Sequence, residues 1–407
     1  MKRVVITGVG AISPLGHDWE TVSARLKGSQ NAIQVMDDWA QYEGLNTRLG
    51  APAAPFELPA HYNRKTTRSM GRNALMAVRA SEVALGDAGL LGDPLVQSGR
   101  MGISYGSSAG TPNSMGDFGN MLNNKTVEGI NATTYIKMMA HTAPVNIAVF
   151  FGMTGRVITT SSACTSGSQG VGYAFEAIRS GAQLAMLAGG SEELCATEAA
   201  VFDTLFATCV SNDTPQLVPR PFDAKRDGLV LGEGAGTLVL EEYEHAKARG
   251  AKIYAEIVGF GTNCDGSHVT NPRSETMGRA MLLALESAGL SPDEIGYVNA
   301  HGTATEQGDI AESQATARVF GRAVPFSSLK SYMGHTLGAC GALEAWMSVR
   351  MMNEGWFSPT LNLTEIDPRC GDLDYIRDGI RAIDTGYVMS NNFAFGGINT
   401  SLIFRRV

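Results

Sequence analysis

The sequence contains an internal repeat, and this repeat constrains the fold more than any other feature. Residues 4–16 read VVITGVGAISPLG, a buried strand that runs into a glycine turn, and residues 255–266 read AEIVGFGTNCDG. Residues 84–90 (ALGDAGL) and 284–290 (ALESAGL) match in the same way, each at the end of an expected amphipathic helix. Self-similarity on this scale predicts two halves built from one order of elements.

The match continues to the end of the chain. Each expected helix leads to a strand, a later strand enters a helix near Cys164 or Gly338, and each half closes with a strand. The matched segments are MGISYG (101–106) with YVNAHG (297–302), residues 157–162 with 324–328, and GTLVLEE (236–242) with NTSLIFR (399–405). Strands that alternate with helices predict an α/β fold with buried sheets of parallel type. The first half has the longer connection, between residues 16 and 84, and no Pro/Ser linker separates the halves, so we expect them to share an interface.

Composition and charge exclude several classes of function. The 407 residues are 44% hydrophobic and 18% charged, which is typical of a chain with a large core. A net charge of -8 without a long basic run argues against nucleic-acid binding, and no apolar run reaches the ~18 residues of a membrane span. The apolar run after Met1 breaks at Gly8 and Gly10, so we interpret it as a strand and not as a signal peptide.

The six cysteines are widely spaced. They form no CxxC pair and no Cys/His cluster of zinc type, which predicts free thiols, a reducing cytosolic location and no metal site. One of them, Cys164, lies in SSACTSG (161–167), after an expected strand and before an expected helix. We expect the helix dipole and the free N–H groups there to lower the pKa of the thiol and favour a nucleophilic thiolate. The alternative is a buried structural cysteine, because free cysteine is among the most buried residue types.

Two histidines follow strands in the second half. His301 lies in NAHGTAT (299–305) and His335 in SLKSYMGH (328–335), and functional residues of α/β folds gather at such strand ends. Each histidine alone is equally well explained as a structural residue. The repeat, however, places the turn at residues 330–335 as the counterpart of the Cys164 turn. Two halves packed about a pseudo-twofold axis would bring Cys164, His301 and His335 to a common centre.

Five motifs in order identify a family. They read SSACTSG (161–167), RPFDAKRDGLVLGEGAG (220–236), NAHGTATEQGD (299–309), SSLKSYMGHTLGACGALE (327–344) and NNFAFGGIN (391–399). Over essentially its whole length the chain resembles the elongating β-ketoacyl-carrier-protein synthases of type II fatty acid and polyketide synthesis. The resemblance implies the thiolase fold, a duplicated αβαβα layered sandwich that forms dimers. The halves would be residues 1–250, with the nucleophile, and 251–407, with both histidines.

The resemblance also implies a role for each motif residue. Cys164 would accept the acyl group, and His301 and His335 would bind and activate a malonyl thioester. Lys330 would order the histidine pair together with Glu344. The reaction would be a decarboxylative condensation without metal or cofactor, in which tetrahedral and enolate oxyanions need preorganised N–H donors.

Further positions concern the substrate and the gate. The backbone N–H groups of Cys164 and Phe395 would form the oxyanion hole, and Phe395 would act as the gate beside the thiol. Residues expected to contact the phosphopantetheine arm or the acyl chain are Thr303, Thr305, Ala109, Phe393 and Phe395. We expect Ala109 to leave room for medium or long acyl chains.

The expected partner is an acyl carrier protein with phosphopantetheine-linked acyl and malonyl groups. Carrier proteins of this kind are acidic, and the segment HYNRKTTRSMGR (61–72) is basic, so the predicted docking residues are Arg64, Lys65 and Arg68, with Lys125 as a further candidate. The resemblance implies either a homodimer or a heterodimer with a ketosynthase-like partner. No nucleic acid or membrane is expected as a partner.

Rival readings depend on single positions. A dinucleotide-binding oxidoreductase would need a third glycine at position 13 after Gly8 and Gly10, but Ser13 and Pro14 follow instead. A non-catalytic ketosynthase-like subunit would lack the nucleophile, which Cys164 supplies. A degradative thiolase would have a second cysteine near its C-terminus, and an initiating synthase a Cys-His-Asn set.

Some positions depart from the usual elongating pattern. Ala394 replaces a usual glycine, Glu306 replaces a common proline, and residues 208–211 lack an arginine often present there. These departures leave open whether the chain serves primary fatty acid synthesis. The alternative is a specialised polyene or polyketide pathway in which the chain acts with a non-catalytic chain-length partner.

Overall fold

Ten strands, five from each half of the chain, form the framework of the fold, and the computed structural model describes residues 1–407. The first-half strands are β1 (Val4–Ile12), β4 (Met101–Gly106), β5 (Val157–Thr160), β6 (Ala185–Glu192) and β8 (Gly234–Glu242). The second-half strands are β9 (Ala255–Cys264), β10 (Tyr297–Asn299), β11 (Pro325–Ser327), β15 (Tyr387–Phe393) and β16 (Ile398–Arg405).

The strand order confirms the duplication expected from the sequence. The first half is ordered β1-β8-β6-β4-β5 and the second β9-β16-β15-β10-β11, so the order of the five strands is the same in both. An antiparallel pairing of β1 with β9 joins the two sets, and β13 (Asp374–Tyr375) extends the far edge. The expected boundary after residue 250 lies between α9 (Tyr243–Ala248) and β9.

The strand directions differ from the expectation of parallel sheets. In each half the inner pairings are antiparallel (β1–β8 and β6–β8, β9–β16 and β15–β16), and only the outer ones are parallel (β4–β5 and β4–β6, β10–β11 and β10–β15). The prediction was wrong because alternation of strands and helices does not reveal where the last strand of each half inserts. That strand lies between the first and the fourth, and it runs antiparallel to both.

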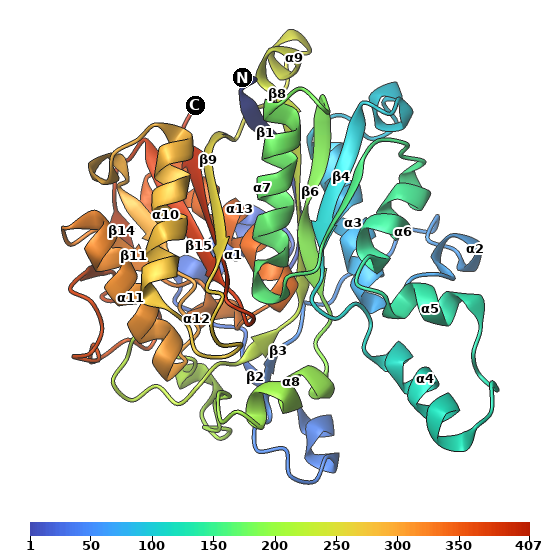
Figure 1. Cartoon of the computed structure of the whole chain (residues 1–407), viewed down its shortest axis with the longest axis horizontal. Helices are drawn as coiled ribbons and strands as arrows, with labels where there is room; N and C mark the ends of the chain where they lie inside the picture. The colour runs from blue at the N-terminus through green and yellow to red at the C-terminus, as the bar shows by residue number, and fades with distance from the viewer.

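Helices complete a five-layer αβαβα arrangement (Figure 1). On the outer faces, α3 (Arg72–Asp87) covers β1 and β8, while α10 (Ser274–Ala288), packed on α11 (Glu306–Phe320), covers β9 and β16. Between the two sets of strands, α7 (Ser166–Arg179) and α13 (Cys340–Glu354) pack against each other. This is the layering of the thiolase fold, as the resemblance implied.

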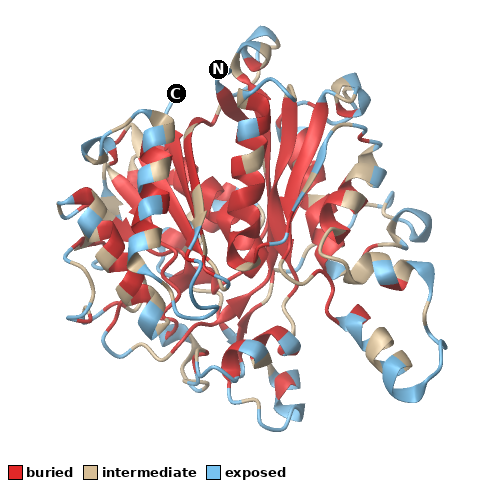
Figure 2. Ribbon diagram, viewed as in Figure 1, coloured by how far each residue is buried: buried red, intermediate tan, exposed pale blue.

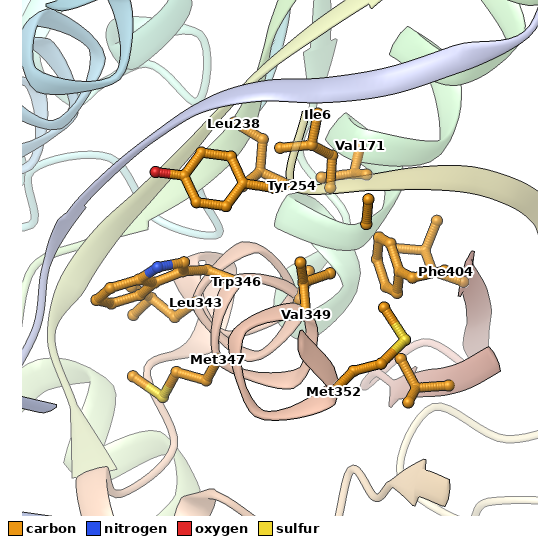
Figure 3. Close-up of a cluster of buried hydrophobic side chains, with 14 of the residues drawn as sticks. Ile6, Val171, Leu238, Tyr254, Leu343, Trp346, Met347, Val349, Met352 and Phe404 are labelled. Atoms are coloured by element: carbon orange, nitrogen blue, oxygen red, sulfur yellow. The ribbon is translucent and has the colours of Figure 1, made fainter. Parts of the chain in front are cut away.

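The central helices and the strands around them are buried (Figure 2), whereas α10 keeps one exposed face. The core between the two sets of strands combines Ile6 of β1, Val171 of α7, Leu343 and Val349 of α13, and Phe404 of β16 (Figure 3). Burial of each such side chain stabilises the fold by about 1.5–3 kcal/mol. Since both halves contribute to this cluster, they form one core.

Gly10 and Gly261 occupy equivalent places in the repeat. A Cβ at Gly10 of β1 would lie 1.9 Å from the carbonyl oxygen of Ala80, and one at Gly261 of β9 would lie 2.1 Å from that of Ala280. Both glycines therefore allow a helix to approach a strand closely. Because Gly10 lies within β1 and not in a phosphate-binding turn after it, the structure rules out the dinucleotide-binding reading.

The remaining elements are short or peripheral. They are α1 (Trp19–Lys27), β2 (Gln34–Val35), β3 (Leu49–Ala51), α2 (Arg64–Thr67), α4 (Asn113–Asn124), α5 (Ala132–Met138), α6 (Thr142–Phe151), α8 (Ala196–Asp203), β7 (Leu231–Gly232), α12 (Lys330–Met333), β12 (Trp356–Phe357) and β14 (Arg381–Ala382). Four of them, α1, β2, β3 and α2, lie in the longer first-half connection. None of the helices has the length and apolar character that crossing a membrane requires.

Candidate active site

Cys164 lies on a sharp turn between β5 and α7. Ala163, just before it, has a left-handed backbone conformation with φ of 49°, and a 3-10 turn over Ala163–Thr165 leads directly into α7. The Ser162 N–H donates to Ser166 Oγ at 3.0 Å, which holds the turn. A left-handed alanine costs free energy and is retained where the surrounding structure requires it. The turn presents a buried Cys164, 3% exposed, at the start of the helix.

The second half has the same turn without a thiol. Leu337 has φ of 43°, a 3-10 turn covers Leu337–Ala339, and α13 follows at Cys340. The position that matches Cys164 is therefore Gly338.

The predicted counterpart of the Cys164 turn, residues 330–335, is thus wrong. Ala163 follows the end of β5 by three positions, whereas Leu337 follows the end of β11 by ten. The connection is seven residues longer in the second half, and this extra length contains Lys330 and His335.

The structure brings the predicted thiol and both imidazoles together. The Cys164 sulfur and one ring nitrogen from each of His301 and His335 all lie within 4.8 Å of one another. The two imidazole rings are perpendicular, with their centroids 5.1 Å apart. A thiol and two imidazoles with this spacing would also suit a soft metal ion such as zinc, so the response of activity to a chelator distinguishes the two uses of these side chains.

Backbone contacts fix how the histidines face the centre. The Leu337 N–H donates to Nδ1 of His335 at 3.3 Å, which places the ring proton on Nε2. That Nε2 is buried without a partner, as is Nδ1 of His301. Glu312 of α11 accepts the backbone N–H groups of His301 and Gly302, both at 2.7 Å, and so holds the loop after β10.

Both histidines are neutral. Burial lowers the pKa of His301 and of His335 well below the usual value, and the nearby positive charge of Lys330 lowers both further. A neutral imidazole can donate one N–H without carrying a charge into the buried centre. The site therefore offers hydrogen-bond donors instead of cations.

Lys330 forms a buried ion pair with Glu344, as the resemblance implied. The Lys330 Nζ lies 2.5 Å from Oε1 of Glu344, and both side chains are almost fully buried. Burial opposes the charge of Lys330, but Glu344 outweighs it and the pKa of Lys330 is raised. The other oxygen of Glu344 accepts from the side-chain amides of Asn392 at 2.8 Å and Asn299 at 3.4 Å.

The electrostatics of Cys164 correct the expectation of a lowered pKa. Burial raises the pKa of the thiol to about 12, although Lys330 and the backbone N–H groups of Phe395 and Cys164 act in the opposite direction. A helix start favours the thiolate, yet complete burial dominates here because the charged form loses its hydration. Cys164 therefore rests as a thiol, and its attack on a substrate must be coupled to loss of the proton.

A cavity of about 330 Å³ opens onto this centre. Four predicted substrate residues line it together with the thiol and the histidines: Thr303, Thr305, Phe393 and Phe395. Phe395 packs on Phe202 of α8, with ring centroids 4.9 Å apart. The adjoining Gly396 and Gly397 have φ of 87° and 73°, conformations that favour glycine.

Sequence reasoning missed several residues of this site. Phe202 and residues 268–272 line the cavity, Asn299 and Asn392 hold Glu344, and Glu312 holds the His301 loop. Asn299, Asn392 and Glu312 lie in or beside the quoted motifs, but a local pattern does not reveal which buried group they contact. Phe202 lies on a helix without a motif of its own.

Other predicted residues lie away from the cavity lining. Ala109 is half-buried after β4, where its N–H donates to Glu192 at 3.2 Å, and its role in an acyl tunnel stays a prediction. The exposed docking candidates lie in the first half, on and beside α2 (Arg64, Lys65 and Arg68) and at the end of α4 (Lys125); both helices are on the right of Figure 1.

Comparisons with known proteins agree over the whole chain. Two family models match, described as β-ketoacyl synthase, N-terminal domain, over residues 1–246, and β-ketoacyl synthase, C-terminal domain, over residues 254–364. The 3-oxoacyl-[acyl-carrier-protein] synthase 2 of Vibrio harveyi is 36% identical over 420 residues, which cover 100% of this chain and 99% of that protein. The corresponding synthase 1 of Haemophilus influenzae is 37% identical over 413 residues, again covering 100% and 99%.

Solved structures are similar as well. The crystal structure of a β-ketoacyl synthase from Burkholderia phymatum STM815 is 61% identical, with a TM-score of 0.99 and complete coverage of both chains. The ishigamide ketosynthase/chain length factor is 32% identical, with a TM-score of 0.89 over 100% of this chain and 99% of that one.

Proposed function

The chain belongs to the β-ketoacyl synthase family, and from that premise we propose that it condenses an acyl group held on Cys164 with a malonyl unit on a carrier protein. The product is a 3-oxoacyl thioester, and carbon dioxide is released. One observation carries the assignment of residues: a buried thiol lies beside two neutral imidazoles, each with an unpartnered ring nitrogen, on the wall of an open cavity.

The first half-reaction transfers the acyl group. The Cys164 sulfur attacks the thioester carbonyl, the bond to the carrier sulfur breaks, and the proton of Cys164 ends on the departing carrier thiol. The backbone N–H groups of Cys164 and Phe395 point at the Cys164 sulfur and lower the pKa of its thiol. They therefore also lie close to the carbonyl oxygen of an acyl group that is bound to this sulfur. Such donors stabilise the tetrahedral oxyanion.

The second half-reaction generates a carbon nucleophile. The malonyl thioester loses carbon dioxide, and the electron pair of the broken carbon–carbon bond moves into an enolate whose oxygen accepts N–H bonds from His301 and His335. The enolate carbon then attacks the acyl carbonyl, and the thiolate of Cys164 leaves and takes up a proton from water. A preorganised donor of this kind is worth about 3–4 kcal/mol.

Lys330 and Glu344 act on this step through the histidines. The fixed positive charge of Lys330 disfavours protonation of both rings, which keeps them uncharged and leaves Nδ1 of His335 as the acceptor of the Leu337 N–H. Because Glu344 is held by two amides besides Lys330, the charge stays in one place.

The carrier protein would dock on the basic side chains of the first half. Arg64, Lys65 and Arg68 are exposed and Lys125 is exposed at the end of α4, which supports recognition of an acidic partner. Thr303 and Thr305 line the cavity and offer hydroxyl groups to a phosphopantetheine arm. The six unpaired cysteines support a reducing cytosolic location.

A second subunit would pair with the first half. The strand β5 ends the sheet with one edge unpaired, Val157 on it is exposed, and Val149 on the neighbouring α6 is 75% exposed. An unpaired edge with apolar neighbours favours continuation of the sheet into another chain. A second copy would give a homodimer, and a non-catalytic ketosynthase-like chain would give the heterodimer of a specialised pathway.

Replacement of the nucleophile tests the proposal. Cys164→Ala should abolish both acylation and condensation when the enzyme is mixed with acyl carrier and malonyl carrier, followed by mass analysis of the enzyme and the products. Cys209→Ala is the matched control, because Cys209 is equally buried but lies outside the cavity. A Cys164→Ala enzyme that still elongates would contradict the proposal.

A further inference from the structure

The repeat that builds the catalytic centre also builds its twofold-related counterpart. The equivalent glycines Gly10 and Gly261 pair with Thr237 and Ser401, so Gly236 matches Thr400, one position later than the sequence pattern indicated. Gly190 lies opposite Gly236 and Asn392 lies opposite Thr400, so Gly190 and Asn392 are equivalent. Two residues further along, Glu192 therefore matches Ala394, the residue before Phe395. Since Gly338 matches Cys164, the counterpart site lies where Glu192 meets Gly338.

The counterpart site is filled by one carboxylate. Oε1 of Glu192 accepts from Ser107 Oγ at 2.8 Å and from the Ala109 N–H at 3.2 Å. Oε2 accepts from the Ser108 N–H at 2.7 Å, from the Gly338 N–H at 3.0 Å and from the Ser108 hydroxyl. Glu192 is fully buried, and none of these partners carries a charge.

The geometry resembles an occupied oxyanion hole. The N–H of Cys164 acts on the substrate side of the catalytic centre, whereas the N–H of its counterpart Gly338 points at a negative oxygen of the protein itself. Five donors point at the two oxygens of Glu192: three backbone N–H groups and two serine hydroxyls. Burial raises the pKa of Glu192, and these donors oppose that rise without cancelling it.

A short path leads from Glu192 to the catalytic centre. Gly338 is held by Glu192, and the preceding residue, Leu337, donates its N–H to Nδ1 of His335. The carbonyl oxygen of Gly338 lies so close to Gly167 on α7 that a Cβ there would be 2.7 Å away. The turn that orients His335 and the helix that follows Cys164 thus meet at Gly338.

We propose that Glu192 is a positioning residue: its carboxylate occupies the counterpart of the oxyanion hole and, through Gly338 and Leu337, fixes the orientation and tautomer of His335. The proposal rests on the role of His335 in decarboxylation given above. It predicts that loss of the carboxylate affects decarboxylation more than acylation, because acylation uses the N–H groups of Cys164 and Phe395.

The test compares Glu192→Ala and Glu192→Gln with the parent enzyme. Carbon dioxide release from malonyl carrier and acylation of Cys164 are measured separately, each with and without added formate. We expect carbon dioxide release to fall by about a hundredfold, the effect of misplacing a reacting group by about 1 Å, with a smaller loss in acylation. Formate should restore part of the release in Glu192→Ala, which leaves an anion-sized space lined by donors, and none in Glu192→Gln, whose amide fills that space.

Glu193→Ala is the matched control. Glu193 is also buried and accepts from the Asn73 N–H at 3.3 Å, but it contacts neither turn, so its loss should leave the ratio of the two activities unchanged and formate without effect. If the melting temperature shows that Glu192→Ala does not fold, Glu192→Gln and Glu192→Asp are compared instead. Only the Gln variant should then lose decarboxylation selectively.

Two results would overturn the proposal. One is parental carbon dioxide release from the folded Gln variant, and the other is an equal loss of both activities without formate rescue. A separate result would show that the proposed function itself is wrong: normal carbon dioxide release from His335→Ala.

Discussion

The two halves of the chain share a strand order, a helix order and a left-handed turn, yet they contribute different parts of the chemistry. The first half supplies Cys164, and the second supplies His301, His335, Phe395 and the buried Lys330. At the matching turn the first half has a thiol and the second has Gly338, whose N–H is occupied by Glu192. The comparison teaches that one order of elements can give two similar turns, of which only the first has a thiol and opens onto the cavity.

The difference arises in one connection. Seven extra residues between β11 and the second-half turn contain both Lys330 and His335. Without this longer connection the second half would repeat the first, with no ion pair and no second imidazole facing Cys164. His335 therefore belongs to the part of the repeat that diverged, whereas His301 follows β10. The largest effects of mutation are expected at these two histidines.

His301→Ala and His335→Ala should cause the largest loss. Each should lower carbon dioxide release by about 10²–10³-fold, the effect of removing one preorganised donor, while acylation of Cys164 is partly retained. Separate assays of carbon dioxide release and of acyl-enzyme by mass analysis check this. Cys164→Gln should show the reverse, with no condensation but continued decarboxylation, because both histidines remain. Normal carbon dioxide release from either histidine variant would contradict the assignment of decarboxylation to the second half.

The equivalence of the two helix-on-strand contacts predicts matched losses of stability. Gly10→Ala and Gly261→Ala should each lower the free energy of unfolding by about 1–3 kcal/mol or more, because the added methyl group overlaps a helix carbonyl. Gly86→Ala on α3 is the control: nothing lies within 4 Å of its Cβ, and the change should stabilise by about 0.5–1 kcal/mol. Urea unfolding at one protein concentration measures all three. A clear loss in one half only would show that the halves are not equivalent here.

The pH dependence of decarboxylation tests the role of the ion pair between Lys330 and Glu344. Both histidines have a lowered pKa. Protonation would put a charge into the buried centre and a proton on Nδ1 of His335, which accepts the Leu337 N–H, so decarboxylation should be lost only as the pH falls below those lowered values. Lys330→Met removes a positive neighbour and should raise the pKa of both rings. The acid limb of the rate profile should then move to higher pH. Lys247→Met, an exposed lysine on α9, should leave the profile unchanged. An unmoved acid limb in Lys330→Met would contradict this role.

The smallest effect is expected at the surface. Reversal of Arg64, Lys65 and Arg68 to Glu should raise the apparent KM for the carrier protein several-fold and weaken its salt dependence, with kcat nearly unchanged. Reversal of Arg279 and Arg318, exposed on second-half helices, should have no such effect. Equal KM values for both sets would place the docking surface elsewhere.

Much of the architecture could be predicted because the repeat is visible in short segments of the sequence. Matched strands, matched helix ends and the glycines of β1 and β9 give the order of elements, since each depends on neighbouring residues. The five motifs also identify Cys164, His301 and His335, whose distances the structure then supplies. The strand directions and the true counterpart of Cys164 were not predictable, because they depend on which segments pair across the fold.

The sequence by itself determined that two similar α/β halves would meet and which side chains are the candidates for the chemistry. Only the tertiary structure decided the charge state of those side chains. The pKa of Cys164 is raised, and not lowered as its helix start suggested, because the whole fold removes water from it. The hydrogen bond from Gly338 to Glu192 and the ion pair of Lys330 with Glu344 likewise cannot be predicted from short segments of the sequence. Burial and contacts between distant segments exist only once the chain has packed, so no local motif contains them.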